Sequence, residues 1–292
     1  NFKDFISFPS LGRNDLRYQI PHPLPHPAFS RGTSMFDTLK ERDVMLHFPY
    51  QSFHHIIDLL REASIDPRVV SIKITLYRVA RNSNVVNALI NAVKNGKQVT
   101  VVMELQARFD EENNIFWAKS LQEEGAQVIF GVPHMKVHSK IFLITRKEEG
   151  KLVHYAHIGT GNLNENTATV YTDKTLLTAD RKITSEVTQI FDFYNDNLRH
   201  GQYKHLLVSP FTMRKKLVQL INNEIEKASN GKKAEIFLKL NNLVDRDMIA
   251  KLYEASNAGV KIRIIIRGTC SLVPQVPGFS ENIEVISIVD KF

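Results

Sequence analysis

Two stretches of the chain, 163 residues apart, match each other in residue type without a gap. Residues 87–105 (NALINAVKNGKQVTVVMEL) align with residues 250–268 (AKLYEASNAGVKIRIIIRG), and the upstream stretches 71–78 and 234–241 also match in type. Any two helix–glycine–strand units look alike, so a chance match stays open. The absence of a gap nevertheless favours a duplicated lobe. A duplication predicts two similar lobes that meet along a cleft.

Helix-type and strand-type patterns alternate along the chain. Apolar residues at helical spacing predict helices, and β-branched runs predict strands. Gly96 is expected to end a helix, because glycine adopts the left-handed conformation at that position. Such an alternation is typical of an α/β layered domain. The predicted helices cover residues 53–63, 84–96, 114–125 and 184–198, and the predicted strands cover 69–77, 98–105, 127–131 and 283–290.

Four prolines in residues 20–29 (IPHPLPHPAF) favour an extended connector and indicate a domain boundary. Composition alone supports a rigid surface loop within one domain nearly as well. We predict the tail of an upstream helical domain with its linker over residues 1–24, a first lobe over 25–205 and an incomplete second lobe over 206–292. The chain has neither an initiator methionine nor a signal peptide, so we interpret it as a fragment.

The chain of 292 residues carries a formal net charge of +7. An excess of lysine and arginine attracts anions such as nucleic acids, acidic membranes and phosphorylated molecules. The single cysteine, Cys270, excludes an internal disulfide and favours a reducing, cytoplasmic compartment. No apolar run approaches the ~18–20 residues of a membrane span.

Residues 138–162 (HSKIFLITRKEEGKLVHYAHIGTGN) place two histidines and a lysine on two apolar stretches joined by a charged turn. In a strand, His138 and Lys140 face the same side. A hairpin that turns between Glu148 and Gly150 returns His157 to the neighbourhood of Lys140. A slip of one residue would turn His157 to the other face, so the register stays open.

These residue types suit phosphate chemistry. A neutral imidazole is a nucleophile toward phosphorus, and a lysine neutralises phosphoryl oxygens. Gly159 and Gly161 would let backbone N–H groups approach an anion, and Asn162 adds an amide donor. Two histidines at the edge of an ordinary hairpin are the competing interpretation. Zinc is disfavoured, because no Cys, Asp or Glu stands at ligand spacing and Lys140 repels cations.

The His-x-Lys and Gly-x-Gly-Asn motifs resemble those of the phospholipase D superfamily, whose nucleophile is a histidine. The resemblance implies an α/β fold of duplicated phospholipase D-like lobes, each a mixed sheet flanked by helices. Two departures stand out: Thr145 replaces the expected Asp, and Asn162 replaces the Ser after Gly161. Both count against a plain phosphodiesterase.

One branch fits more closely, and the chain resembles the polyphosphate kinase family from about residue 20 to its end. The resemblance is carried by residues 43–53, 71–80, 95–131, 136–146, 155–180, 238–245 and 264–278. It implies a phosphohistidine at His138, with assistance from His157. It also implies that Arg78 and Arg108 lie at a phosphate and Mg²⁺ site. Because arginine stays protonated, we expect both to bind phosphoryl oxygens that the metal shares.

By the same resemblance Tyr171 and Arg267 match nucleotide-contacting positions. Taken alone, Tyr171 would be interpreted as a half-buried structural residue, and Asp110 and Glu111 as a solvated helix cap rather than water-mediated Mg²⁺ ligands. No Gly-x-x-x-x-Gly-Lys-Ser/Thr loop is present, which excludes a P-loop kinase.

The expected reaction is reversible transfer of the terminal phosphate of ATP, through His138, to inorganic polyphosphate, with Mg²⁺ as cofactor. The expected partners are ATP, ADP and polyphosphate, with no nucleic acid and with a homo-oligomeric assembly. The expected location is the cytoplasm, with peripheral association at the inner face of the membrane. The duplication places the counterpart of His138 beyond Phe292, so residues 1–292 alone are expected to be inactive. Two alternatives are a phospholipase D-like phosphodiesterase and a non-catalytic anion-binding module; histidines that face apart would favour the module.

Overall fold

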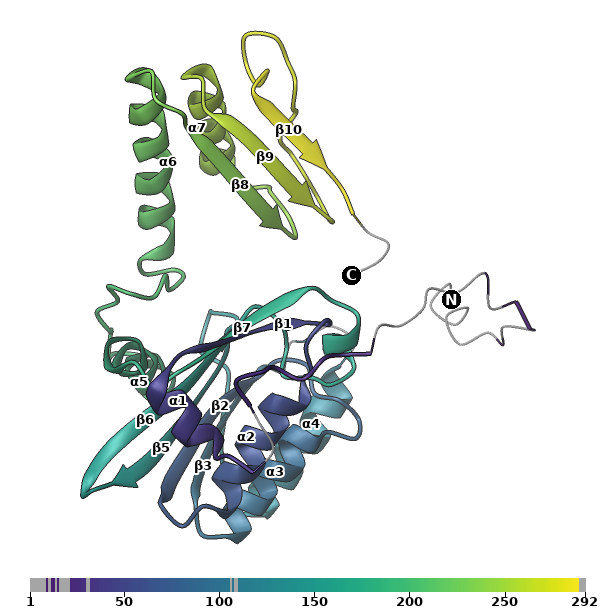
Figure 1. Ribbon diagram of the computed structural model, residues 1–292, viewed down its shortest axis with the longest axis vertical. Coiled ribbons are helices and arrows are strands. Elements are labelled where there is room, and N and C mark those ends of the chain that lie inside the picture. The colour runs from purple at the N-terminus through teal and green to yellow at the C-terminus, as the bar shows by residue number, and fades with distance from the viewer. Residues whose placement is uncertain are drawn as a thin grey trace. The chain divides into compact units, whose positions relative to one another are not determined.

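The computed structural model describes residues 22–29, 32–105, 107 and 110–288, together with Pro9, Gly12, Arg13 and Asp15. The chain divides into two compact units, Asn1–Val187 and Thr188–Phe292, each described by itself below (Figure 1). This division falls within helix α5 (Arg181–Asn195). The predicted tail over residues 1–24 lies largely outside the described residues. The predicted domain limits stay predictions.

The first unit is built on a seven-stranded mixed sheet in the order β1-β7-β6-β5-β2-β3-β4 (Figure 1). Strands β2, β3 and β4 run parallel, and all other neighbours run antiparallel. The strands are β1 (Val44–Phe48), β2 (Val69–Leu76), β3 (Gln98–Met103), β4 (Gln127–Phe130), β5 (Lys140–Glu148), β6 (Lys151–Gly159) and β7 (Asp173–Thr178).

Helices α2, α3 and α4 cover one face of this sheet (Figure 1). Helix α3 shows why the sequence folds this way. The Ser83 side chain accepts a hydrogen bond from Val86 N at the first turn, and Val85, Leu89 and Ala92 turn into the core. The helices of the unit are α1 (Met35–Glu41), α2 (His54–Ile65), α3 (Asn84–Lys94) and α4 (Glu111–Glu123), followed by α5.

The β5–β6 hairpin turns at Glu149 and Gly150, which both have positive φ, at 47° and 78°. Two central residues with positive φ match the right-handed twist of the paired strands. The turn lies where the sequence predicts it. Lys140 pairs with Gly159 and Phe142 with His157, so His157 lies on the same face of the sheet as Lys140.

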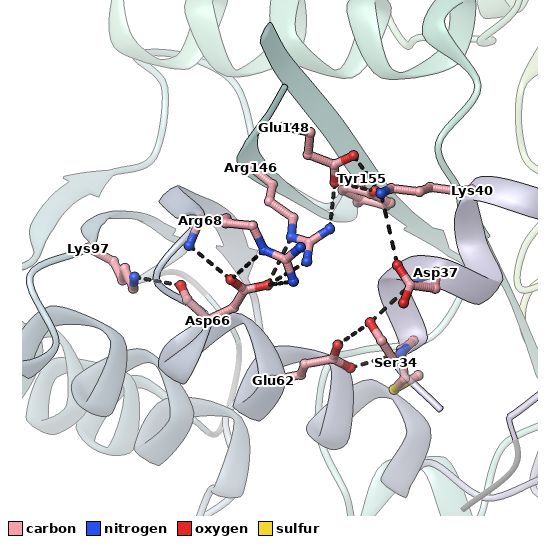
Figure 2. A network of polar contacts seen from close by, with 11 residues as sticks. Ser34, Asp37, Lys40, Glu62, Asp66, Arg68, Lys97, Arg146, Glu148 and Tyr155 are labelled. Atoms are coloured by element: carbon pink, nitrogen blue, oxygen red, sulfur yellow. Dashed lines mark hydrogen bonds and ion pairs between the residues drawn. The ribbon is translucent and has the colours of Figure 1, made fainter. Parts of the chain in front are cut away.

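A network of charged groups lies at the turn end of the hairpin (Figure 2). The fully buried Arg146 guanidinium contacts the Asp66 carboxylate at 2.8 Å and the Glu148 carboxylate at 2.6 Å. Tyr155 Oη donates to Glu148 at 2.8 Å, and Lys40 lies 2.7 Å from the same carboxylate. Because Asp66 ends α2 and Lys40 belongs to α1, the network fixes both helices to the hairpin.

The second unit has a three-stranded parallel sheet, β8 (Glu235–Leu240), β9 (Lys261–Ile266) and β10 (Ile283–Ile286), with helices α6 (Met213–Ser229) and α7 (Arg246–Asn257). Its buried core is formed by α6, α7 and the inward residues of the strands. No helix in the described part of the chain has the length and apolar character needed to cross a bilayer.

The second unit repeats the α3–β3 part of the first. Strand β9 begins and ends 163 residues after β3, as the sequence match requires. Both helices end at a glycine with positive φ, 76° at Gly96 and 93° at Gly259. Gly96 N donates to Val93 O at 2.9 Å, and Gly259 N donates to Ser256 O at 3.0 Å, again 163 residues apart. The predicted α/β fold with two related lobes is therefore confirmed.

Candidate active site

Several candidate residues of the first unit meet at one edge of the sheet. Strand β2 ends where β5 begins, because Ile74 pairs with Phe142 in an antiparallel register. Strand β6 ends at the same edge, since Gly159 pairs with Lys140. The segments that leave these strands carry Tyr77 and Arg78, His138, and residues 160–172.

His138 lies in the segment that precedes β5, and part of its surface is exposed. Its imidazole meets the Tyr77 ring edge-on, with centroids 4.7 Å apart and planes at 82°. The backbone N–H of Val137 donates to the buried Glu104 carboxylate at 2.8 Å, which fixes this segment to the end of β3. The nucleophile candidate is thus held from two sides, by an aromatic ring and by a carboxylate.

Three cations surround the same tyrosine. Lys140 Nζ lies 4.7 Å, Lys136 Nζ 5.4 Å and Arg78 Cζ 6.0 Å from the centroid of the Tyr77 ring. The face of an aromatic ring attracts cations at such distances. Tyr77 therefore gathers positive charge around His138. Sequence reasoning missed this residue; the available signal was an aromatic side chain directly before Arg78 at the end of a strand.

The pKa of His138 is lowered from 6.5 to about 4. Partial burial is the first cause, and repulsion from Lys140, Lys136 and Arg78 adds to it. Glu104 acts in the opposite direction, and the cations outweigh it. The imidazole is therefore neutral at physiological pH, with a lone pair available for attack on an electrophile.

Lys140 is only 6% exposed, and its ammonium donates a hydrogen bond to the backbone carbonyl of His138. Burial lowers its pKa from 10.5 to about 7, Asp173 opposes the shift, and Arg78 and Lys136 reinforce it. An anion bound beside Lys140 would stabilise its charged form. The lysine is thus suited to neutralise oxygens of a group attacked by His138.

His157 is 1% exposed and lies within the sheet. Its ring stacks on Phe142 at 4.7 Å, and its Nε2 is 3.2 Å from Thr175 Oγ1. Burial lowers its pKa to about 3, so the ring stays neutral. Among the described residues no hydrogen bond joins His157 to His138. Its predicted assistance to His138 stays a prediction.

Both motif glycines make room for neighbouring side chains. A Cβ on Gly161 would lie 2.3 Å from Asp173 Oδ2, and Thr160 Oγ1 donates to the same carboxylate at 2.7 Å. Asn162 is half-buried, and its Oδ1 is buried without a hydrogen-bond partner. This packing differs from the expectation that the glycines open their backbone to an anion, because a carboxylate already fills the space beside Gly161.

Arg78 is 37% exposed, and its Nε lies 3.4 Å from Asp110 Oδ2. Asp110 precedes α4 and its side chain makes no capping hydrogen bond to the first turn, while Glu111 lies in that turn. The described residues contain no cluster of three His, Cys, Asp or Glu side chains that could hold a metal ion. Mg²⁺ commonly uses one or two carboxylates together with substrate phosphates, so the Asp110 oxygen beside Arg78 fits such a shared site.

The remaining candidates are not all brought together. Tyr171 is 42% exposed and follows the short 3₁₀ turn Thr167–Thr169, at the same edge as His138. Arg267 is exposed at the end of β9 in the second unit. Gly268, next to it, packs against Asn242, because a Cβ there would lie 2.4 Å from the amide oxygen. Arg108 lies outside the described residues.

Two family models match the chain. Polyphosphate kinase C-terminal domain 1 matches residues 34–200, and polyphosphate kinase C-terminal domain 2 matches residues 206–292. The chain belongs to the polyphosphate kinase family. The predicted resemblance is confirmed by these two matches, which together leave only the first residues and a short linker uncovered.

Curated relatives agree with this assignment. The chain is 56% identical over 292 residues to a polyphosphate kinase of Vibrio vulnificus, and 50% identical over 297 residues to that of Escherichia coli. All of this chain is covered, against 42% and 43% of the two relatives. The chain thus spans less than half the length of these polyphosphate kinases.

Solved structures support the fold. A polyphosphate kinase of Porphyromonas gingivalis matches with a TM-score of 0.88 at 37% identity, covering 100% of this chain and 48% of that one. A phosphatidylserine synthase of Haemophilus influenzae matches with a TM-score of 0.51 at 14% identity, over 77% of this chain and 61% of that one. The second likeness concerns the fold alone.

Proposed function

We propose that the full-length protein is a polyphosphate kinase that transfers the terminal phosphate of ATP, through a phosphohistidine at His138, to inorganic polyphosphate. The observation that carries the proposal is the contact of the His138 imidazole with the Tyr77 ring, around which three cations gather. Membership of the family supports the same activity. The proposed partners are ATP, ADP and polyphosphate in a cytoplasmic homo-oligomer with peripheral membrane association, and nucleic acid is not a substrate.

In the first half-reaction, the lone pair of an imidazole nitrogen of His138 attacks the γ-phosphorus of ATP. The N–P bond forms as the bond to the bridging oxygen breaks, and ADP leaves with that electron pair. In the second half-reaction, a terminal oxygen of polyphosphate attacks the same phosphorus, and the electron pair of the N–P bond returns to His138. Each step is reversible, because ADP attacks by the same route.

Positive groups would stabilise the charge on the transferred phosphoryl group. Lys140 and Arg78 are placed to bind its oxygens, and Arg108 is assigned the same role by family resemblance. Asp110 would hold Mg²⁺ together with phosphate oxygens bound by Arg78, and a bound Mg²⁺ would neutralise phosphate charge. Asn162 is a further donor for phosphate. Tyr171 and Arg267 are assigned to the nucleotide, and His157 to support of the nucleophile.

Two other functions have less support. A phosphodiesterase of the phospholipase D type would need an acid at position 145. Thr145 is instead buried, and its Oγ1 bonds His154 Nδ1 at 3.1 Å near the turn end of the hairpin. A non-catalytic anion-binding module would need no neutral nucleophile. It also does not require His157 to lie on the same face of the sheet as Lys140, as it does here.

The test is labelling of the full-length protein with γ-³²P-ATP and Mg²⁺. We expect label on His138 that acid removes and alkali does not, as for a P–N bond, and we expect it to chase into polyphosphate. His138→Ala should remove both signals. His154→Gln, which changes another histidine of the hairpin, should keep them. Label that persists in His138→Ala would overturn the proposal.

A further inference from the structure

Helix α4 bonds directly to the segment that carries Tyr77 and Arg78. Asn113 Nδ2 donates to Val79 O at 2.7 Å, and Trp117 Nε1 donates to Ala80 O at 3.0 Å. Asn114, between them on the same helix, donates to Tyr77 O at 2.9 Å. Three side chains of one helix thus satisfy three backbone carbonyls of residues 77–80.

Asn114 makes a second bond that the other two lack. Its Nδ2 also donates to Glu104 O at 3.0 Å, at the end of β3. Glu104 accepts from Val137 N through its side chain, next to His138. One fully buried amide therefore connects both supports of the nucleophile: the tyrosine that meets the imidazole edge-on and the carboxylate that holds its backbone.

We propose that Asn114 is a positioning residue that sets the placement of His138 relative to Tyr77 and its cations. The inference rests on the proposed function for its activity readout, and a second readout is independent of activity. Burial makes the bonds of Asn114 hard to replace, because its side chain has 0% exposure and buried polar groups need a hydrogen-bond partner. The last backbone bond between the two strands runs from Glu104 N to Leu76 O at 3.0 Å, so loss of the Asn114 amide would loosen the segments that follow it, at Tyr77 and Glu104.

Loss of the Asn114 amide is expected to raise the pKa of His138. The charged groups that face it are Lys140 from β5, Lys136 from its own segment, Arg78 after β2 and Glu104 after β3. Loosening these segments would hydrate the imidazole and move the cations away. Its pKa would then rise from about 4 toward the ordinary value of 6.5.

The experiment compares Asn114→Ala with Asn95→Ala in the full-length protein. Asn95 also donates its amide to a backbone carbonyl, that of Ser64, at 3.0 Å. It lies at the C-terminal end of α3, at the opposite edge of the parallel strands. The control therefore removes the same kind of bond away from the site.

For Asn114→Ala we expect kcat for labelling of His138 to fall roughly ten- to a hundredfold, as for misplacement of a reacting group by about 1 Å, with a smaller change in KM for ATP. Carbethoxylation of His138 by diethylpyrocarbonate, followed by peptide mass spectrometry across pH, should show an upward shift of its midpoint. Asn95→Ala should change neither readout.

Should Asn114→Ala fail to fold, Trp117→Phe keeps an aromatic side chain but lacks the indole N–H that bonds Ala80 O, and it should move both readouts in the same direction by less. A folded Asn114→Ala protein with wild-type kcat and an unchanged carbethoxylation midpoint would overturn the inference. Wild-type protein that takes no label on His138 would instead overturn the proposed function. The carbethoxylation midpoint would then still decide the role of Asn114.

Discussion

The imidazole of His157 lies against the side of Gly159 where a Cβ would be, two residues further along strand β6 and on the same face. A Cβ built on Gly159 would lie 2.8 Å from His157 Cε1, and also 2.8 Å from Thr175 Oγ1, which is the partner of the same imidazole. Real Cβ atoms do not approach other atoms this closely. The absence of a side chain at position 159 therefore makes room for the buried histidine.

Gly159→Ala should displace His157 and disturb strand β6 beside Lys140. We expect the free energy of unfolding to fall by about 1–3 kcal/mol, as for overpacking, together with a fall in the rate of His138 labelling. The control is Gly150→Ala in the turn, where φ is 78° and nothing lies within 4 Å of the added Cβ. It should cost about 1–2 kcal/mol through backbone strain and leave labelling unchanged. Equal labelling rates in both variants would separate Gly159 from the site.

Arg78→Lys should weaken ATP binding although the charge is kept. A lysine cannot make the paired, planar contacts of a guanidinium, and a charge-assisted hydrogen bond contributes about 1.5–3 kcal/mol. The expected rise in Kd is about ten- to a hundredfold. Arg61→Lys is the control, since Arg61 is exposed on α2 and pairs with Asp58 at 3.7 Å. Isothermal titration with a non-hydrolysable ATP analogue measures both, and an unchanged Kd in Arg78→Lys would place this arginine outside the site.

The sequence predicts the parallel part of the first unit well, because each element carries its own signal. The predicted strand over residues 98–105 corresponds to β3, and the predicted helix over residues 53–63 corresponds to α2. The elements α1, β1 and β7 were not predicted. Strand β7 begins with Asp173 and Lys174 and has no strong period, and it is ordered by pairing with β1 and β6.

The residues of the candidate site also divide into those that the sequence predicts and those that it does not. His138, Lys140 and His157 stand out in the sequence because hairpin geometry is local. Tyr77 and Asn114 do not, because their roles depend on contacts between elements far apart in the chain. The register of β2 against β5 brings Tyr77 to His138, and the packing of α4 brings Asn114 to Tyr77. No local pattern encodes either contact.

The buried Arg146 predicts an acid-dependent stability (Figure 2). Burial alone would raise the pKa of Asp66, but hydrogen bonds from Arg68 and Arg146 outweigh it and the pKa is lowered below 3.8. For Glu148, burial is likewise outweighed by Lys40, Arg146 and Tyr155, so its pKa lies below 4.5. Because both folded pKa values are depressed, this stability is complete above the ordinary values and is lost as the pH falls through the folded ones.

Asp66→Asn should therefore lower the free energy of unfolding at pH 7 by about 3–5 kcal/mol, because it leaves a buried cation with one partner fewer. It should also flatten the loss of stability on acidification. Asp58→Asn, which removes an exposed partner of Arg61, should cost less than about 1 kcal/mol. Urea unfolding at a series of pH values measures both. A variant with the full acid dependence of the wild type would contradict this account.

Lys140 predicts proton uptake when a phosphate chain binds. Its pKa of about 7 means that a large part of the ammonium is deprotonated at pH 8 in the ligand-free protein. A polyanion beside it favours the charged form, so binding should raise this pKa and draw a proton from solvent. Affinity for polyphosphate should accordingly weaken as the pH rises above 7.

Titration calorimetry at pH 8, in two buffers of different ionisation enthalpy, measures the uptake directly. We expect a fraction of one proton per site in the wild type. Lys140→Arg should abolish the uptake and the loss of affinity above pH 7, because a guanidinium stays charged. His138→Ala should keep both, since His138 is already neutral at this pH. Wild-type binding without proton uptake would mean that Lys140 does not contact the bound anion, and its role would then reduce to the hydrogen bond with the His138 carbonyl.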